Sequence, residues 1–537
     1  MKRLITSACL AGLAASSISA AIVKVSSPIT SDTTWTASNE YVLTDIIFVR
    51  DATLTIEAGT IIRGEPKSGE SVNDPGALVI TRSGQIDAEG TPSNPIVFTT
   101  AVLDSDGDGQ YSDESYDYAS NINYTSEISG GANFLDSDPL NSPLTPGFGY
   151  VTTAASTAHV GADEYRGLWG GVIILGNAPT NIMEITEPSS GVYKLSKTSI
   201  LARTDLDDIF EGFIEGLDPL DTLNNDGVYG GSNPNDSSGT FRYVSIRHGG
   251  TNIAADNEIN GLTMAGVGAG TLIEFVEVYC NDDDGFEWFG GTVNTRYLVS
   301  LYNNDDSFDI DEGFTGLGQF WFSLQLDDGN GDHGGEHDGT AGSFSFVDVD
   351  SLNGTTVTGT GGAGIGLPIG FPTIYNATYV NSPLGDNMLK FDDSFGCNYY
   401  NSIFVGTPSV LVNVTSDAQG RVDVADCGFV SNSVFYNING ETGSLANSDL
   451  ADYSGLQTIL AANGNVSGTN PFSSLTNTTV RAGVDPRASS ATPGGVTLEP
   501  VTATFFITAS YAGAFDPVES DYWTDVWTVF SANVDNK

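Results

Sequence analysis

The chain has 537 residues and a formal net charge of −49, because 68 Asp and Glu residues stand against only 19 Lys and Arg. So negative a surface repels phosphate backbones and anionic lipid headgroups, which excludes nucleic-acid binding and attachment to membrane surfaces. Charged residues make up 16% of the chain and hydrophobic residues 39%, so a charge-rich disordered chain and a coiled coil are excluded as well.

Residues 1–21 have the pattern of a secretory signal peptide. Lys2 and Arg3 precede an apolar run of small residues, which ends at the cleavage-type residues Ala20 and Ala21. No later apolar run reaches the ~18 residues that a membrane-spanning helix needs. We therefore expect an exported protein, extracellular or on the cell surface, that is not inserted in a membrane.

Residues 22–103 predict an N-terminal cap and the first turns of a repetitive β structure. The segments 53–64 and 78–89 share glycines, Gly59 and Gly84, and isoleucines, Ile61 and Ile86, at an offset of 25 residues. Short strands joined by glycine turns explain this spacing.

Residues 104–165 interrupt the repeats with a polar, acidic insertion. Asp104, Asp106 and Asp108 match positions 1, 3 and 5 of an EF-hand-type calcium loop, and Gln110 offers its carbonyl at position 7. Position 12 departs from that pattern, since Ser115 stands there. We expect a calcium loop that stiffens the insertion; the alternative is a solvated acidic loop.

The strongest repeat lies in residues 240–475, after a further coil at 166–183 and a second loop insertion at 184–239. The segments Val276–Gly291, Leu298–Gly313 and Phe320–Gly335 superimpose at a period of 22 residues. This register places Val276, Leu298 and Phe320 on one inward face of stacked strands, and Trp321 on the outward face. A unit of short strands, glycine turns and stacked side chains predicts an all-β solenoid, a parallel β-helix.

The same register stacks two columns of aspartates. Strands of a sheet lie about 4.8 Å apart, and two unit charges at that distance repel by roughly 3 kcal/mol at an effective dielectric of 20. Shared protons or bound cations must relieve that repulsion, and oxygen ligands without a neighbouring lysine favour Ca²⁺ in a structural role. The alternative is that these side chains only cap turns. The predicted ligands are Asp283, Asp284, Asp305, Asp306, Asp327 and Asp328.

The segment from Asp332 to Asp338 holds two of the four histidines of the chain, His333 and His337, with Glu336 between them. Such a cluster suits a transition metal or acid–base chemistry. On a turn, however, the two histidines need not converge. We expect polar turn residues here.

Residues 476–537 predict a C-terminal cap. This segment is aromatic and non-repetitive, with Tyr511, Trp523 and Trp527. A solenoid needs such a cap to cover its last coil. The only short helix that we expect lies between Leu201 and Leu217.

The cysteines predict little. Cys280, Cys397 and Cys427 remain after removal of the signal peptide, an odd number that allows at most one disulfide. We expect buried thiols.

Several motifs together resemble a family of secreted bacterial proteins. These motifs are Gly167–Pro179, Arg247 with the following His-Gly-Gly, Asn257–Leu262 and Tyr511–Phe515. The resemblance implies a right-handed parallel β-helix of pectate-lyase-like architecture. It carries no established activity.

Two classes of function follow. The first is a non-catalytic extracellular protein, stiffened by calcium, that binds a polysaccharide or a cell-surface protein or builds a surface layer. Scarce basic residues favour this role. The aromatics Trp288 and Trp321 are candidates for stacking on sugars, or else belong to the core.

The second class is an enzyme that cleaves polysaccharides. An inverting hydrolase needs two separated carboxylates, for which Asp283, Asp284 and Asp306 are candidates, with Arg247 or His248 to orient the substrate. A calcium-dependent lyase needs a basic residue instead, and Arg247, Arg296 and Lys390 are among the few available.

Overall fold

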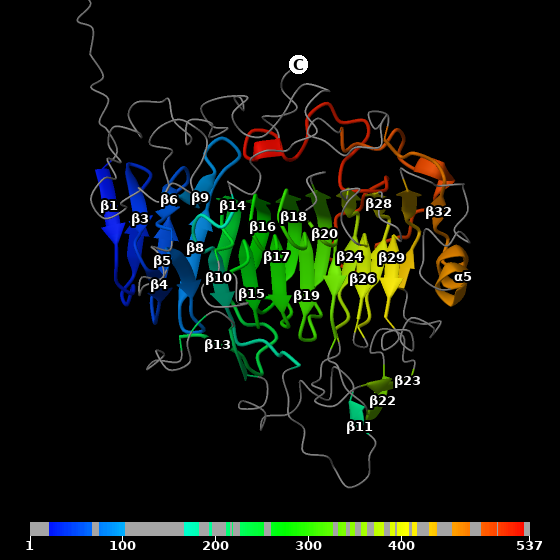
Figure 1. Ribbon diagram of the computed structural model, residues 1–537, viewed down its shortest axis with the longest axis horizontal. Coiled ribbons are helices and arrows are strands. Elements are labelled where there is room, and N and C mark those ends of the chain that lie inside the picture. The colour runs from blue at the N-terminus through cyan, green and yellow to red at the C-terminus, as the bar shows by residue number, and fades with distance from the viewer. Residues whose placement is uncertain are drawn as a thin grey trace, which may run out of the picture.

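The computed structural model is a solenoid of parallel β-strands, whose strands lie side by side in one long row (Figure 1). It describes residues 21–66, 75–101, 166–181, 193–195, 211–214, 217, 226–251, 259–325, 331–339, 344–349, 356–361, 370–380, 387–392, 395–406, 411–415, 429–437, 454–472, 485–501 and 503–530. The predicted all-β parallel β-helix is confirmed.

Face 1 of the solenoid is a seven-stranded parallel sheet, because each coil contributes one short strand to it. Isolated bridges continue it from β21 to β26, which pairs in parallel with β29. In chain order the strands are β4 (Ile46–Val49), β7 (Ala77–Ile80), β10 (Val172–Leu175), β15 (Leu262–Ala265), β17 (Phe286–Phe289), β19 (Phe308–Asp311), β21 (Glu336–His337), β26 (Leu389–Phe391) and β29 (Val412–Val414).

Faces 2 and 3 belong to one sheet of 18 strands, and four long strands run through both faces. These are β14 (Gly239–Arg247), β16 (Leu272–Tyr279), β18 (Asn294–Leu301) and β20 (Leu317–Leu324). Face 2 further contains β2 (Thr33–Trp35), β5 (Thr53–Ile56), β8 (Gln85–Glu89), β24 (Thr373–Tyr375), β27 (Asn398–Tyr400) and β30 (Phe429–Ser431). Face 3 contains β1 (Ala21–Val25), β3 (Asn39–Leu43), β6 (Ile61–Gly64), β9 (Ile96–Thr100), β25 (Thr378–Val380), β28 (Ile403–Gly406), β31 (Val434–Asn437) and β32 (Val466–Ser467).

Two small antiparallel pairings accompany the solenoid. β12 (Glu211–Phe213) pairs with β13 (Val228–Gly230), and β22 (Phe344–Val349) pairs with β23 (Thr356–Gly361). β22 also pairs in parallel with β11 (Tyr193–Leu195). Glu211–Phe213 lies within the range where we expected a short helix, so that prediction is wrong at these residues. The α-helix of the described residues is α5 (Ser454–Ala462), which lies at the end of the row (Figure 1).

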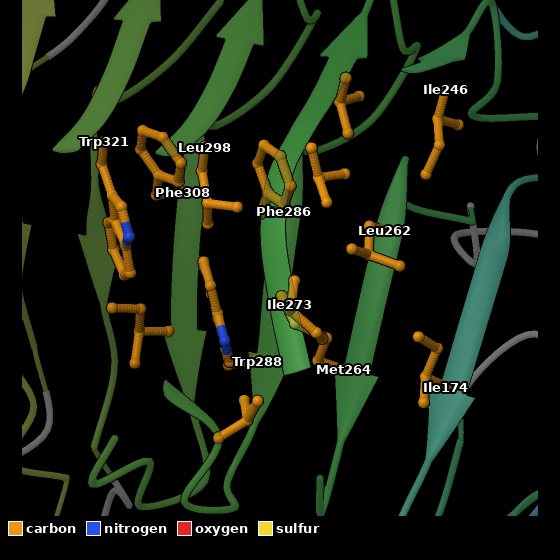
Figure 2. Close-up of a cluster of buried hydrophobic side chains, with 14 of the residues drawn as sticks. Ile174, Ile246, Leu262, Met264, Ile273, Phe286, Trp288, Leu298, Phe308 and Trp321 are labelled. Carbon is orange, nitrogen blue, oxygen red and sulfur yellow. The ribbon is translucent and has the colours of Figure 1, made fainter. Parts of the chain in front are cut away.

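The core is the space that the three faces enclose. Inward side chains of successive coils stack directly on one another, as Figure 2 shows for Leu262, Phe286 and Phe308. The indole rings of Trp288 and Trp321 stack with centroids 4.9 Å apart, and both residues have no exposed surface. The two tryptophans are therefore core residues, and the idea that they are exposed for sugar stacking is wrong.

The 22-residue register holds for one step and then fails. Val276 pairs with Leu298, as predicted, but Leu298 pairs with Trp321 and not with Phe320. The connection from β19 to β20 has one residue more than that from β17 to β18, which shifts the next strand by one position. Because side chains alternate along a strand, the shift points Trp321 into the core and places Phe320 at a bend.

Bends between faces 2 and 3 carry aromatic residues with left-handed backbone. Tyr243, Phe275, Tyr297 and Phe320 have φ between 49° and 60°, a conformation that costs an ordinary residue about 1 kcal/mol or more. Their rings stack at centroid distances of 4.4, 4.3 and 4.9 Å along the solenoid. In later coils the same bend carries asparagine, namely Asn376, Asn401 and Asn432.

The C-terminal segment 485–530, called the strap here, packs along the side of the solenoid and is drawn at the red end of the colour scale (Figure 1). It begins beside the last coils, where the side-chain amide of Asn432 donates to the Thr497 carbonyl at 2.7 Å. It ends beside the stacked bend aromatics, where Trp527 packs edge-on against Tyr243. The predicted cap therefore runs along the solenoid and is not confined to its last coil.

Glu277 fastens the end of the strap. Its carboxylate accepts a hydrogen bond from the Ser245 hydroxyl at 2.6 Å and another from the Val529 backbone N–H at 2.8 Å. The side chain is completely buried, and this burial raises its pKa to about 7, although the nearby Arg247 guanidinium opposes the shift.

Glu277→Gln tests this burial. Because the folded pKa lies above the ordinary value of 4.5, folding favours the protonated form, and the wild type should lose stability as the pH rises from about 4.5 to about 7. Relative to the glutamine variant, we expect a loss of about 3 kcal/mol over that range, from urea unfolding at several pH values. Glu519→Gln, an exposed position on the strap, is the matched control. A wild-type-minus-variant difference that does not change with pH would contradict the assignment.

Candidate functional site: an acidic face

The outward side of face 1 is acidic. Along β17, β19 and β21 the side chains alternate, so that Phe286, Phe308 and their inward neighbours fill the core while every second residue points outward. Glu287 pairs in register with Asp309, and Asp309 pairs with Glu336. Three successive coils therefore place a carboxylate at the same outward position.

The turns between faces 3 and 1 add a second column. The Asp306 backbone N–H donates to Asp284 Oδ1 at 2.9 Å, and the His333 N–H donates to Asp306 Oδ1 at 2.5 Å. Each aspartate thus caps the turn of the next coil, as the alternative interpretation predicted. The residue stacked above Asp306 is His333, 27 positions further on. Asp327 and Asp328 lie outside the described residues.

The predicted aspartates do come together. Carboxylate oxygens of Asp283, Asp284 and Asp305 lie within 4.8 Å of one another, as do those of Asp305, Asp306 and Asp332. In a third group, carboxylate oxygens of Asp284, Glu287 and Asp309 also lie within 4.8 Å of one another. Charges at this separation repel by roughly 3 kcal/mol a pair at an effective dielectric of 20.

Two basic side chains contact one part of this acidic face. His333 Nδ1 lies 3.0 Å from Asp306 Oδ1 and 3.4 Å from Glu336 Oε2, and Lys390 Nζ contacts Glu336 Oε1. Burial opposes protonation of His333, but the hydrogen bonds with Asp306 and Glu336 prevail and raise its pKa to about 11. The same contacts overcome burial at Glu336 and hold the pKa of its carboxyl well below the usual range. Glu336 is therefore ionised and His333 is an imidazolium at neutral pH.

Three other carboxyls of the acidic face, those of Asp284, Asp309 and Asp338, have raised pKa values. Burial, followed by the charges of Asp283 and Asp309, raises the pKa of Asp284. Burial and the charge of Asp306 raise the pKa of Asp309 in the same way. Further along face 1, burial and the charge of Glu336 raise the pKa of Asp338 to about 7. These three carboxyls therefore keep their protons to a higher pH than an ordinary aspartate does.

The two histidines of the 332–338 segment point to opposite sides. His333 belongs to the acidic face, whereas His337 faces the core, where its Nε2 lies 2.8 Å from the Tyr399 hydroxyl and its ring stacks on Phe391. Burial lowers the pKa of His337 to about 4 and keeps the imidazole neutral. They do not converge on one metal, and neither is a simple polar turn residue.

Several other predicted site residues take part in different contacts. Arg247 is buried and donates to Ser245 Oγ at 2.8 Å beside Glu277, and His248 is buried against Tyr279. Arg296 forms an ion pair with Glu274.

The calcium-type loop with Asp104, Asp106, Asp108 and Gln110 lies outside the described residues. Cys427 does as well. Cys280 and Cys397 are both buried, and no disulfide is formed in the described part of the chain.

Sequence reasoning missed Glu287, Asp309 and Asp311 on this face. Their signal is the alternation inside each face 1 strand, as in Phe-Glu-Trp-Phe at 286–289 and Phe-Asp-Ile-Asp at 308–311. Where acidic residues alternate with bulky apolar residues along a strand, the pattern predicts one acidic side and one buried side.

Fold and face together define a parallel β-helix whose turns and one sheet face are acidic. The chain matches the model of the pectate-lyase-like β-helix domain over residues 27–110 and 223–450, more than half of its length, and it belongs to that family. No curated protein and no solved structure matches it. Within the described residues, no helix is long and apolar enough to span a bilayer.

Proposed function

We propose that this protein is exported and serves outside the cell as a calcium-stabilised β-helix with a non-catalytic binding or structural role. The observation that carries the proposal is the turn cluster of Asp283, Asp284 and Asp305, whose carboxylate oxygens lie within 4.8 Å of one another. Asp305 is exposed and Asp283 half-buried, so an ion has access from solvent.

Calcium suits this cluster because all of its ligands are oxygens. Ca²⁺ takes six to eight oxygen ligands in flexible geometry, and carboxylates, backbone carbonyls and water supply them. In the described part of the chain, His333 and Lys390 contact Asp306 and Glu336, on a neighbouring part of the acidic face. A loop of the same chemistry at residues 104–110 would supply a further calcium site under this proposal.

The binding partner that we propose is a polysaccharide or a cell-surface protein. A net charge of −49 disfavours anionic partners unless bound calcium bridges the two surfaces. A solenoid presents a long, regular surface on which extended ligands lie well. Stability in this role comes from the core and from the bound ions.

An enzyme that cleaves polysaccharides is the second candidate, and one observation favours it. Buried carboxyls with raised pKa, Asp284 and Asp309, lie on the same face as the ionised Glu336. Acids and bases of general catalysis are separated by environment in this way. Arg247 and His248 are buried elsewhere and give this candidate no support as substrate-orienting groups.

A polysaccharide panel separates the two candidates. We expect purified protein from Ala21 onward to be retained on at least one glycan in the presence of Ca²⁺, without new reducing ends or unsaturated products. Asp305→Asn should weaken retention, whereas Asp516→Asn, on the strap, should not. Products that form with wild type and disappear with Asp284→Asn would replace the binding role by catalysis. If the protein is not retained on any glycan and forms no products, the structural role remains.

A further inference from the structure

We infer a second, buried site for a hard divalent cation, formed by the carboxylates of Asp284, Glu287 and Asp309 with the side-chain oxygen of Asn260. The site lies beside the exposed turn cluster and shares only Asp284 with it. This inference rests on the proposed function in one respect, namely that the acidic face binds cations.

Two successive coils bring the three carboxylates together. Glu287 on β17 and Asp309 on β19 are direct neighbours in the sheet, and Asp284 lies in the turn that leads into β17. One oxygen of each lies within 4.8 Å of the others. Asp284 is 8% and Glu287 7% exposed, so water screens their charges poorly, and Asp309 is half-buried.

Asn260 is the independent sign of a ligand. It precedes β15, and the backbone of Gly261 donates to the Asp284 carbonyl, which places Asn260 next to Asp284 in the turn column. Its side-chain amide reaches the cluster, because Nδ2 donates to Glu287 Oε2. The residue is 2% exposed, yet its Oδ1 has no hydrogen-bond partner in the described part of the chain.

Asp309 repeats this pattern, since its Oδ1 is also buried without a partner among the described residues. Buried oxygens of this kind are uncommon in folded proteins, and a bound ion is one of the few groups that satisfies them. A cation between the carboxylates binds Glu287 itself. The Asn260 amide is then free to turn its carbonyl oxygen toward the ion.

The donor set selects the class of ion. All four ligand groups offer oxygen, and neither His nor Cys belongs to the cluster, so Ca²⁺, Mg²⁺ or Mn²⁺ fits better than zinc or copper. In the described part of the chain, His333 contacts Asp306 and Lys390 contacts Glu336, and neither of these two carboxylates belongs to the proposed site.

Calcium titrations of four variants test the site. Calorimetry of metal-free protein with CaCl₂ should resolve two classes of site in the wild type. Asp309→Asn and Asn260→Ala should each weaken one class at least tenfold, Asp305→Asn should weaken the other, and Asp516→Asn should change neither. MnCl₂, followed by electron paramagnetic resonance, provides an independent count of bound ions.

Thermal unfolding distinguishes the loss of a calcium site from general damage to the fold. In excess EDTA, Asp309→Asn removes a repulsive charge and should melt at or above the wild-type temperature. In excess Ca²⁺ the same variant should melt below the wild type. If Asp309→Asn is too unstable to purify, Asn260→Ala carries the calcium-binding test.

The outcomes separate this inference from the proposed function. If Asp305→Asn alone loses calcium, and Asp309→Asn and Asn260→Ala bind like the wild type, the buried site is wrong and the proposed function stands. If the wild type binds neither Ca²⁺ nor Mn²⁺, both are wrong. Loss of one class of site in Asp309→Asn, with the sign reversal in melting temperature, supports the buried site.

Discussion

Removing Ca²⁺ should lower the melting temperature of this protein by several degrees. An ion that binds only the folded chain stabilises it by about 2.7 kcal/mol at a free concentration one hundred times its dissociation constant. Removal also restores the repulsion among carboxylates such as Asp283, Asp284 and Asp305, whose oxygens lie within 4.8 Å of one another. Circular dichroism during heating, in EDTA and then in excess CaCl₂, measures the shift.

Two aspartate variants control the chelation experiment. Asp305→Asn removes one carboxylate of the turn cluster and should reduce the calcium-dependent shift. Asp516→Asn lies on the strap, where its Oδ1 accepts the Val518 N–H, and should leave the shift unchanged. A chelator titration without any shift would contradict calcium binding at these turns.

Replacing Trp288 by alanine should cost about 4 kcal/mol of unfolding free energy. The indole is completely buried and stacks on Trp321, with Phe314 5.5 Å away between ring centroids, so the substitution leaves a cavity that the parallel coils cannot close. Urea unfolding followed by tryptophan fluorescence and circular dichroism measures the loss.

Trp288→Phe is the graded comparison. It keeps an aromatic ring in the stack and should lose much less stability than the alanine variant. An alanine variant with less than about 1 kcal/mol of destabilisation would contradict the core position of Trp288 and reopen a surface role for it.

The acidic face shows how much of the candidate site can be predicted from local sequence patterns. Asp283 and Asp284 stand 22 residues before Asp305 and Asp306, and that spacing alone predicts that they meet, because coils without insertions stack residue on residue. The same reasoning applied to the alternating strands would have added Glu287 and Asp309. Alternation and repeat length are properties of the chain itself, so they can be read before any contact is known.

The third coil shows where this reasoning stops. One extra residue before β20 turns Trp321 into the core, and a longer connection before β21 brings His333 above Asp306. Turn lengths differ by single residues that no periodicity signals. Because side chains alternate along a strand, each such residue reverses which of them point inward.

By itself, then, the sequence determined the parallel β-helix, the 22-residue step from Val276 to Leu298 and the meeting of the first four aspartates. Only the tertiary structure decided that His333 contacts Asp306 and Lys390 contacts Glu336, that His337 faces the core, and that Arg247 lies beside Glu277. It also decided that the strap runs along the side of the solenoid. These contacts join residues far apart in the chain, and their partners are selected by the stacking of whole coils, which local spacing does not encode.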